Sequence, residues 1–316
     1  MNKQPFALLI ASILFALIFG SLTTIQAEAE TEPHTAATPE FINIQDGNNI
    51  QLQGDGKPFK PANIKKIDEP IGDDRAIFGL DNRHPMLSRD YPWAAIGRIE
   101  AVKADGKTDY HCTGSLITED IVLANAHCVV DPYTYKVSKE IKFRPNVING
   151  RSKDDNDTAV VKKIIAGTNF KEANPSKNDW AVVKIDKPLG KKYGYFGWVS
   201  LPTSQMVKYP KKFRMIGYSG DFPTPETVKA FPYLEAGEGL TAGVHVGCRI
   251  LKEDNGSLSH DCDTTGGASG GPIVAQIKGK YYIIALNNAE RFTFEGEALD
   301  NRAVKVSFLD RLFGRR

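Results

Sequence analysis

Residues 263–272 read Asp-Thr-Thr-Gly-Gly-Ala-Ser-Gly-Gly-Pro, so that one serine, Ser269, stands inside a glycine-rich run. Far upstream, residues 123–128 read Leu-Ala-Asn-Ala-His-Cys and contain His127. Between these two stretches, residues 178–183 read Asn-Asp-Trp-Ala-Val-Val and contain Asp179. In chain order the three are a base, a carboxylate that can orient it and a nucleophile, which predicts acyl-transfer chemistry.

The chemistry of a serine nucleophile explains why these residue types are needed together. A hydroxyl is a poor nucleophile at neutral pH, so a neutral imidazole must take its proton as the oxygen attacks. A buried carboxylate holds that imidazole in the right tautomer and stabilises its charged form. We therefore predict Ser269 as nucleophile, His127 as general base and Asp179 as the orienting carboxylate. The N–H groups of Gly267 and Ser269 are expected to form the oxyanion hole.

The order of the three residues separates this site from other serine hydrolases. Residues 267–271 also fit the nucleophile elbow of α/β-hydrolases, which needs a histidine after the serine. The last histidine is His260, so the elbow is excluded on order alone. The subtilisin order needs an aspartate before the histidine, and several precede His127, but no alternating helix and strand pattern surrounds these residues.

The motif blocks resemble those of the chymotrypsin-like serine peptidases, and within them the bacterial V8 or glutamyl-endopeptidase group. Residues 111–117 resemble the strand before the catalytic histidine, 122–129 the histidine block and 179–183 the aspartate block. Residues 263–272 resemble the serine block, and 301–304 resemble the closing segment of the V8-like group. Together and in this order, the blocks are a far more specific signal than any one of them.

The resemblance covers roughly residues 77–312 and implies an all-β fold of two antiparallel six-stranded barrels with a short C-terminal helix. Many short β-type runs with Gly, Pro and Asn between them agree with that fold. The candidate strands are 93–102, 113–117, 121–124, 140–143, 160–165, 180–185, 213–217, 243–251, 272–277, 281–287 and 303–307. An apolar stripe predicts a terminal helix around residues 306–312.

The length and composition of the chain agree with one double-barrel domain that follows an N-terminal leader segment. The chain has 316 residues, of which 41% are hydrophobic, enough to bury a full core. The formal net charge of +2 gives no reason to expect nucleic acid as a partner. We expect a monomer that acts on protein or peptide substrates, with neither cofactor nor metal.

The N-terminal part of the chain predicts export and processing. Residues 1–29 combine an early Lys3, a short apolar run and a small-residue cleavage site, which is typical of a signal peptide. The alternative is a membrane anchor, but the apolar run is too short, so we expect no stable membrane insertion and a secreted or periplasmic protein. Residues 30–75 are polar and read as a pro-segment or flexible leader, or as a surface linker, and 76–316 as the peptidase domain of a zymogen.

Four cysteines in an exported chain predict two disulfides, and three pairings are possible. Joining Cys112 to Cys128 and Cys248 to Cys262 closes the two smallest loops, and the first bond ties the histidine segment to the preceding strand. A loop of this size stabilises by about 3 kcal/mol in the chain-entropy model. A metal site is the weaker reading because the spacings are long.

The expected substrate pocket contains Asp263, Thr264 and Leu286. Asp263 lies six residues before Ser269, where trypsin-like enzymes carry the carboxylate that pairs with Arg or Lys. Residues 283–288 lack the histidine with which glutamate-specific relatives bind an acidic side chain, and Leu286 is the nearest match to its place. We therefore predict no strict glutamate preference, and basic side chains are favoured if Asp263 faces the pocket.

Two alternatives use the same fold for other purposes. A catalytically silent relative would bind peptides without cutting them, and an esterase would use the same triad on a different acyl group. Silent relatives commonly lose a triad residue, and all three are present here, which favours the secreted serine endopeptidase.

Overall fold

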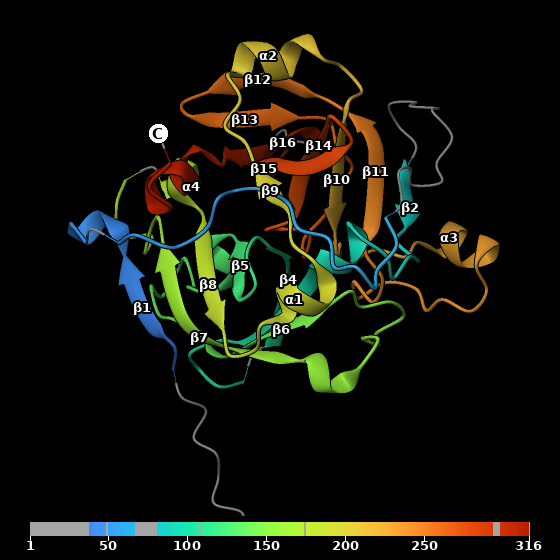
Figure 1. Ribbon diagram of the computed structural model, residues 1–316, viewed down its shortest axis with the longest axis horizontal. Coiled ribbons are helices and arrows are strands. Elements are labelled where there is room, and N and C mark those ends of the chain that lie inside the picture. Colours follow the sequence, from blue (N-terminus) through green and yellow to red (C-terminus); the bar gives the residue numbers. More distant parts are fainter. Residues whose placement is uncertain are drawn as a thin grey trace, which may run out of the picture. The chain divides into compact units, whose positions relative to one another are not determined.

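Two β-sheets form most of the structure, a computed structural model that describes residues 38–315 except 49, 67–80, 108, 174 and 293–297. The first sheet has the strand order β1-β7-β6-β3-β4-β5-β8, and a further β7–β8 pairing closes all but β1 into a six-stranded barrel (Figure 1). Its strands are β1 (Glu40–Asn43), β3 (Ile96–Val102), β4 (Asp109–Leu116), β5 (Ile121–Ala124), β6 (Lys139–Pro145), β7 (Ala159–Ala166) and β8 (Ala181–Ile185).

The second sheet has the order β12-β13-β16-β15-β14-β10-β11-β2, and β9 pairs with β15 outside this path. Its strands are β2 (Arg83–Pro85), β9 (Gly197–Trp198), β10 (Phe213–Gly217), β11 (Gly243–Cys248), β12 (Ile250–Asp254), β13 (Ser257–His260), β14 (Pro272–Ile277), β15 (Lys280–Phe292) and β16 (Ala298–Lys305). The all-β prediction is confirmed. Among the described residues no pairing joins β12 to β2, so this sheet is a half-barrel rather than a closed one.

Helices are few and short. They are α1 (Leu189–Tyr193), α2 (Thr203–Lys208), α3 (Pro225–Ala230) and α4 (Ser307–Leu312). The predicted C-terminal helix is therefore confirmed as α4, which buries Phe308, Leu309 and Leu312. Phe308 stacks flat on Trp180, with ring centroids 4.0 Å apart, and so fixes the chain directly after Asp179.

Strand patterns show how the core supports the histidine segment. In β3 buried and partly buried residues alternate from Gly97 onward, which is the period of a strand with one face on the core. In β5 all four residues are buried, so this strand crosses the interior and then leads into the turn Ala126–Cys128 that carries His127. Each large aliphatic side chain buried in this way contributes roughly 1.5–3 kcal/mol.

Both disulfides have the pairing that closes the smallest loops. Cys112 joins Cys128 and Cys248 joins Cys262, with Cα–Cα separations of 5.9 and 4.8 Å. The first bond ties β4 to the turn that carries His127, as predicted.

The region predicted as a pro-segment or leader is described only from residue 38 to residue 66, apart from residue 49, and the predicted signal peptide lies outside the described residues. Its described part lies on the barrel, since β1 pairs in parallel with β7. No helix among the described residues is long and apolar enough to span a membrane.

Candidate active site

His127 and Asp179 are brought together although 52 residues separate them in sequence. His127 lies in the turn after β5. Asp179 directly precedes Trp180, whose ring stacks on Phe308 of α4. The Nδ1 atom of His127 lies 2.7 Å from Oδ2 of Asp179, and the backbone N–H of His127 donates to Oδ1 at 3.0 Å. The carboxylate therefore fixes both the ring and the backbone of the histidine, as an orienting acid must.

The electrostatics of this pair prepare the imidazole to accept a proton. The side chain of Asp179 is 8% exposed and that of His127 is 25% exposed. Burial disfavours the charged ring, but the charge of Asp179 and its hydrogen bond outweigh burial and raise the pKa of His127 above its ordinary value. A proton taken by the ring is therefore stabilised by a carboxylate already in place.

Ser269 comes from the other sheet, in the loop that leads into β14, and its backbone lies against the histidine segment. Its carbonyl oxygen accepts a hydrogen bond from Thr113 N at 2.8 Å and lies 3.7 Å from Sγ of Cys128. The hydrogen bonds of the described residues include none between Ser269 Oγ and the His127 ring. Such contacts are often long before substrate binds.

Glycines are required on both sides of Ser269. Gly267 has φ +96°, and a Cβ there would lie 2.4 Å from Nε2 of His111 and 2.6 Å from the Tyr218 carbonyl oxygen. Gly270 has φ +81°, and a Cβ there would lie 2.2 Å from the Thr113 carbonyl oxygen. Among the described residues, the N–H groups of Gly267 and Ser269 donate to no other protein group, which leaves both free for an oxyanion.

Two asparagines that the sequence did not reveal as site residues hold Asp179. Asn125 donates from Nδ2 to the carbonyl oxygen of Asp179 at 2.6 Å. Asn288 donates from Nδ2 to the Ser176 carbonyl oxygen at 3.2 Å and lies 3.5 Å from Oδ2 of Asp179. The only sequence signal for them is their position: Asn125 lies inside the histidine block, and Asn288 lies at the end of an apolar strand.

Asp263 turns its carboxylate to the N-terminal part of the domain. Oδ2 accepts hydrogen bonds from the backbone and side-chain nitrogens of Asn82, at 2.7 and 3.0 Å. The N–H of Asp263 donates to Nδ1 of His245, a buried ring whose pKa is lowered mainly by burial. The carboxylate that sequence comparison with trypsin-like enzymes offered for Arg or Lys is thus already engaged.

Thr264 forms a side-chain hydrogen bond with Asn287, the residue after the expected pocket residue Leu286. Asn287 donates from Nδ2 to Thr264 Oγ1 at 3.1 Å and to the Ala268 carbonyl oxygen at 3.2 Å. Leu286, expected to line the pocket, is fully buried in the core cluster instead. Successive strand residues face opposite sides of a sheet, so a shift of one position explains the difference. Behind Asn287 lies the fully buried His260, with Nε2 3.1 Å from its Oδ1.

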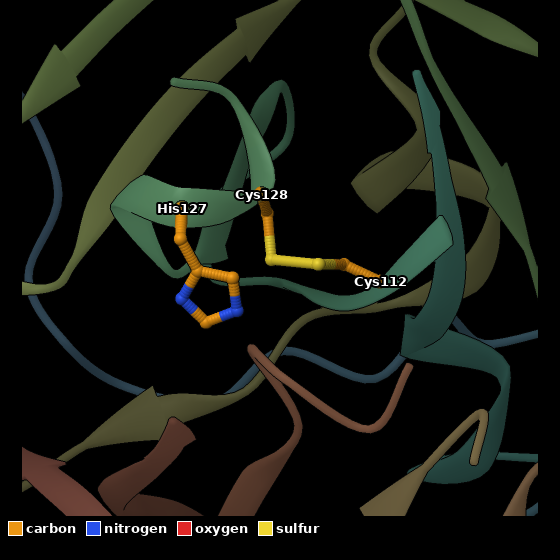
Figure 2. A group of neighbouring side chains, drawn as sticks. All are labelled: Cys112, His127 and Cys128. Carbon is orange, nitrogen blue, oxygen red and sulfur yellow. A yellow bond between two sulfur atoms is a disulfide. The ribbon is translucent and has the colours of Figure 1, made fainter. Parts of the chain in front are cut away.

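Cys112, His127 and Cys128 offer possible metal-ligand atoms within 4.8 Å of one another. Figure 2 shows that the two sulfurs are joined and that the imidazole ring lies beside the disulfide. A cysteine binds a metal ion through its thiolate, and the sulfurs of a disulfide are not thiolates. The two cysteines therefore form a structural disulfide next to His127, the proposed base, and not a metal site.

Comparison with known sequences defines the class of protein. A family profile described as Trypsin matches residues 88–304, more than half of the chain. The chain belongs to the trypsin family of serine peptidases, which share a chymotrypsin-like fold.

Two curated relatives show how far the likeness in sequence extends. The chain is similar to CLIP domain-containing serine protease B4 of Anopheles gambiae, at 27% identity over 67% of this chain and 62% of the relative. It is also similar to Serine protease 23 of Bos taurus, at 24% identity over 64% of this chain and 52% of the relative. The chain thus spans between half and two thirds of the length of these relatives.

Solved structures confirm the fold. One, described as a Glu endopeptidase in complex with MPD, matches with a TM-score of 0.56 and 19% identity, over 75% of this chain and 97% of that one. Another, the thermostable serine protease AL20, matches with a TM-score of 0.53 and 13% identity, over 70% and 96% of the two chains. At these identities the likeness extends to the fold alone.

Proposed function

We propose that this protein is a secreted serine endopeptidase in which Ser269 attacks the peptide carbonyl, His127 takes its proton and Asp179 orients the ring. The observation that carries the proposal is the 2.7 Å contact between His127 and Asp179 beside the Ser269 loop. The proton that His127 takes from Ser269 passes to the leaving amine, and water then hydrolyses the acyl-enzyme by the same route. The N–H groups of Gly267 and Ser269 stabilise the oxyanion.

Two hollows beside the proposed site suit a polypeptide rather than a small ester. One, of about 690 Å³, is lined by residues that include Ser176 and Asn288, both in contact with the Asp179 segment. The other, of about 610 Å³, is lined by residues that include His111, which packs against Gly267. A substrate large enough to reach both hollows from the proposed site is a polypeptide rather than a small ester, and we therefore favour an endopeptidase over an esterase.

Casein hydrolysis tests the proposal. Ser269→Ala and His127→Ala should each remove nearly all hydrolysis, while a residual acceleration of about 10³–10⁴ over water survives from the oxyanion hole and binding. Circular dichroism of each variant should match the parent, since neither side chain carries the fold. A wild-type rate in Ser269→Ala would show that another residue is the nucleophile.

Membership of the V8 group within the family is part of this proposal, carried by the motif blocks and by the fold shared with a Glu endopeptidase. Export is supported by the two disulfides, because such bonds persist in oxidising compartments. The predicted cuts lie near Ala29 and between Asp74 and Ile77, outside the described residues. Mass analysis of active exported protein that starts well upstream of residue 60 would contradict the second cut.

A further inference from the structure

Residues 40–66, called the strap below, begin as an outer strand of the first barrel. β1 pairs in parallel with β7, from Glu40 opposite Lys163 to Asn43 opposite Ala166. The Lys163 ammonium lies 3.0 Å from Oε1 of Glu40, and Gln45 donates from Nε2 to the Gly167 carbonyl oxygen at 3.0 Å. Backbone pairing of this kind binds a segment whatever its covalent connection.

Apolar side chains of the strap are partly buried against the domain. Those packed against the main core cluster are Phe41, Ile42, Ile44, Ile50, Leu52 and Ile64. The N–H of Leu52 donates to the Leu312 carbonyl oxygen at 2.7 Å, at the end of α4. A Cβ on Gly54 would lie 2.9 Å from the Phe313 ring, so the strap passes this C-terminal segment in close contact.

The middle of the strap crosses to the second sheet, as the blue trace beside β9 in Figure 1 shows. The N–H of Trp198, in β9, donates to the Gly56 carbonyl oxygen at 3.1 Å. Phe59 and Tyr195 exchange two backbone hydrogen bonds of 3.0 Å, and their rings stack with centroids 5.2 Å apart. The strap therefore joins the first barrel, the second sheet and α4.

The chain is held independently on both sides of residues 67–80. Before them, the Lys65 carbonyl oxygen accepts from the N–H of Tyr91 at 3.0 Å. After them, Arg83 binds Asp81 and Asp221, with shortest N–O distances of 2.8 and 2.7 Å. A cut between these anchors would release neither end.

We propose that the strap stays bound after the maturation cut, so that the mature protein is a complex of two chains held without a covalent link. The strap has no cysteine, so no disulfide can retain it. Among the described residues, the strap contacts reported above involve neither His127 nor Asp179 nor Ser269, so we treat the strap as a structural part of the protein and not as a plug that must leave the site. The proposal rests on the proposed cut but not on the peptidase activity.

The test uses the full chain with Ser269→Ala, which prevents self-digestion. A recognition sequence for a site-specific protease replaces residues near Asp74, and the folded protein is then cut. The strap fragment should co-elute with the domain in gel filtration at a one-to-one ratio by native mass spectrometry, and should separate in denaturant. A fragment that elutes alone, leaving a domain with unchanged Tm, would overturn the proposal.

Matched variants show which contacts retain the strap. Ile42→Asp with Phe59→Ala should weaken retention of the cut fragment at least tenfold, whereas Gln53→Ala, on an exposed strap residue, should leave it unchanged. Equal retention in both would contradict the assigned contacts. If the double variant does not fold, co-elution of the two fragments of the cut parent protein alone tests the proposal. A failed casein assay has no bearing on any of these results.

Discussion

At the scale of single residues, Asp179 should determine the pH at which His127, the proposed base, accepts a proton. Because Asp179 raises the pKa of His127, the ring should lose its proton only above its ordinary value of about 6.5. The base must be neutral, so kcat/KM should fall as the pH drops through that raised pKa.

Asp179→Asn removes the charge that opposes burial. The acid limb of kcat/KM should therefore move to lower pH, and kcat should fall about 10⁴-fold because the ring is no longer held in the right tautomer. Rates measured from pH 4.5 to 9 check both effects. An acid limb that stays in place in the variant would mean that Asp179 does not set the pKa of His127.

Specificity is also decided by a few side chains. Thr264 and Asn287 give the expected pocket neutral groups, and the Asp263 carboxylate is engaged by Asn82. An unpaired glutamate charge in such a pocket costs several kcal/mol. For matched substrates with Glu, Arg and Leu before the cut bond, the advantage of Glu in kcat/KM should stay below about tenfold, or 1.4 kcal/mol.

Asn82→Ala provides the internal check on this explanation. It removes the side-chain donor to Asp263, so the rate on Arg substrates should rise relative to Leu substrates. A strong Glu preference in the parent would reveal a cationic donor in the pocket that the described residues do not supply.

At the scale of elements, His260 at the end of β13, beside Asn287 of the expected pocket, should make the stability of the fold depend on pH. His260 is fully buried, and burial lowers its pKa to about 4. The unfolded chain has a histidine pKa of about 6.5, so between these values only the unfolded state binds the proton. Stability is therefore complete above pH 6.5 and is lost as the pH falls toward 4.

The free energy of unfolding should consequently drop by about 2 kcal/mol from this residue alone between pH 7.5 and pH 5. Urea titrations of the Ser269→Ala protein at the two pH values measure it. His260→Gln should reduce the drop by that amount, whereas His84→Gln, on a partly exposed residue of β2, is the matched control. An equal drop in His260→Gln would show that other groups dominate acid sensitivity.

Elements also show what a sequence can and cannot predict. Blocks with a chemical reason for each residue predicted the candidate triad, which stays a prediction. Short β-type runs and a C-terminal apolar stripe predicted the all-β fold and α4, which the structure confirms. Residues 243–251, predicted as one strand, are split into β11 and β12 because the Asp261 carboxylate binds the N–H of Arg249, a contact that no local pattern reveals. Helices α1 to α3 were missed because each buries at most two large apolar side chains, whereas the equally short α4 buries three and so shows an apolar stripe.

Contacts between residues far apart in the chain could not be predicted from the sequence, for a different reason. Asn82 and Asp263 are 181 residues apart, and nothing in either stretch predicts that they meet. The engagement of Asp263, and with it the character of the pocket, follows only from the folded chain.

At the scale of the whole domain, the proposed active site exists only where the two sheets meet. His127 and Asp179 come from the first barrel, and Ser269 comes from the loop before β14 in the second sheet. The Trp180–Phe308 stack and the contact of Thr113 with Ser269 hold the two parts in register. Reactivity of Ser269 should therefore depend on the intact fold and not on its local sequence.

Labelling with a fluorophosphonate, followed by intact and peptide mass spectrometry, tests this central claim most directly, because the probe modifies only an activated serine. The folded protein should gain one adduct, located on Ser269, and urea-unfolded protein should gain none. Ser269→Ala should stay unlabelled, and His127→Ala should react far more slowly. An adduct on another residue, or no adduct on the folded parent, would contradict the assignment of Ser269 as the nucleophile.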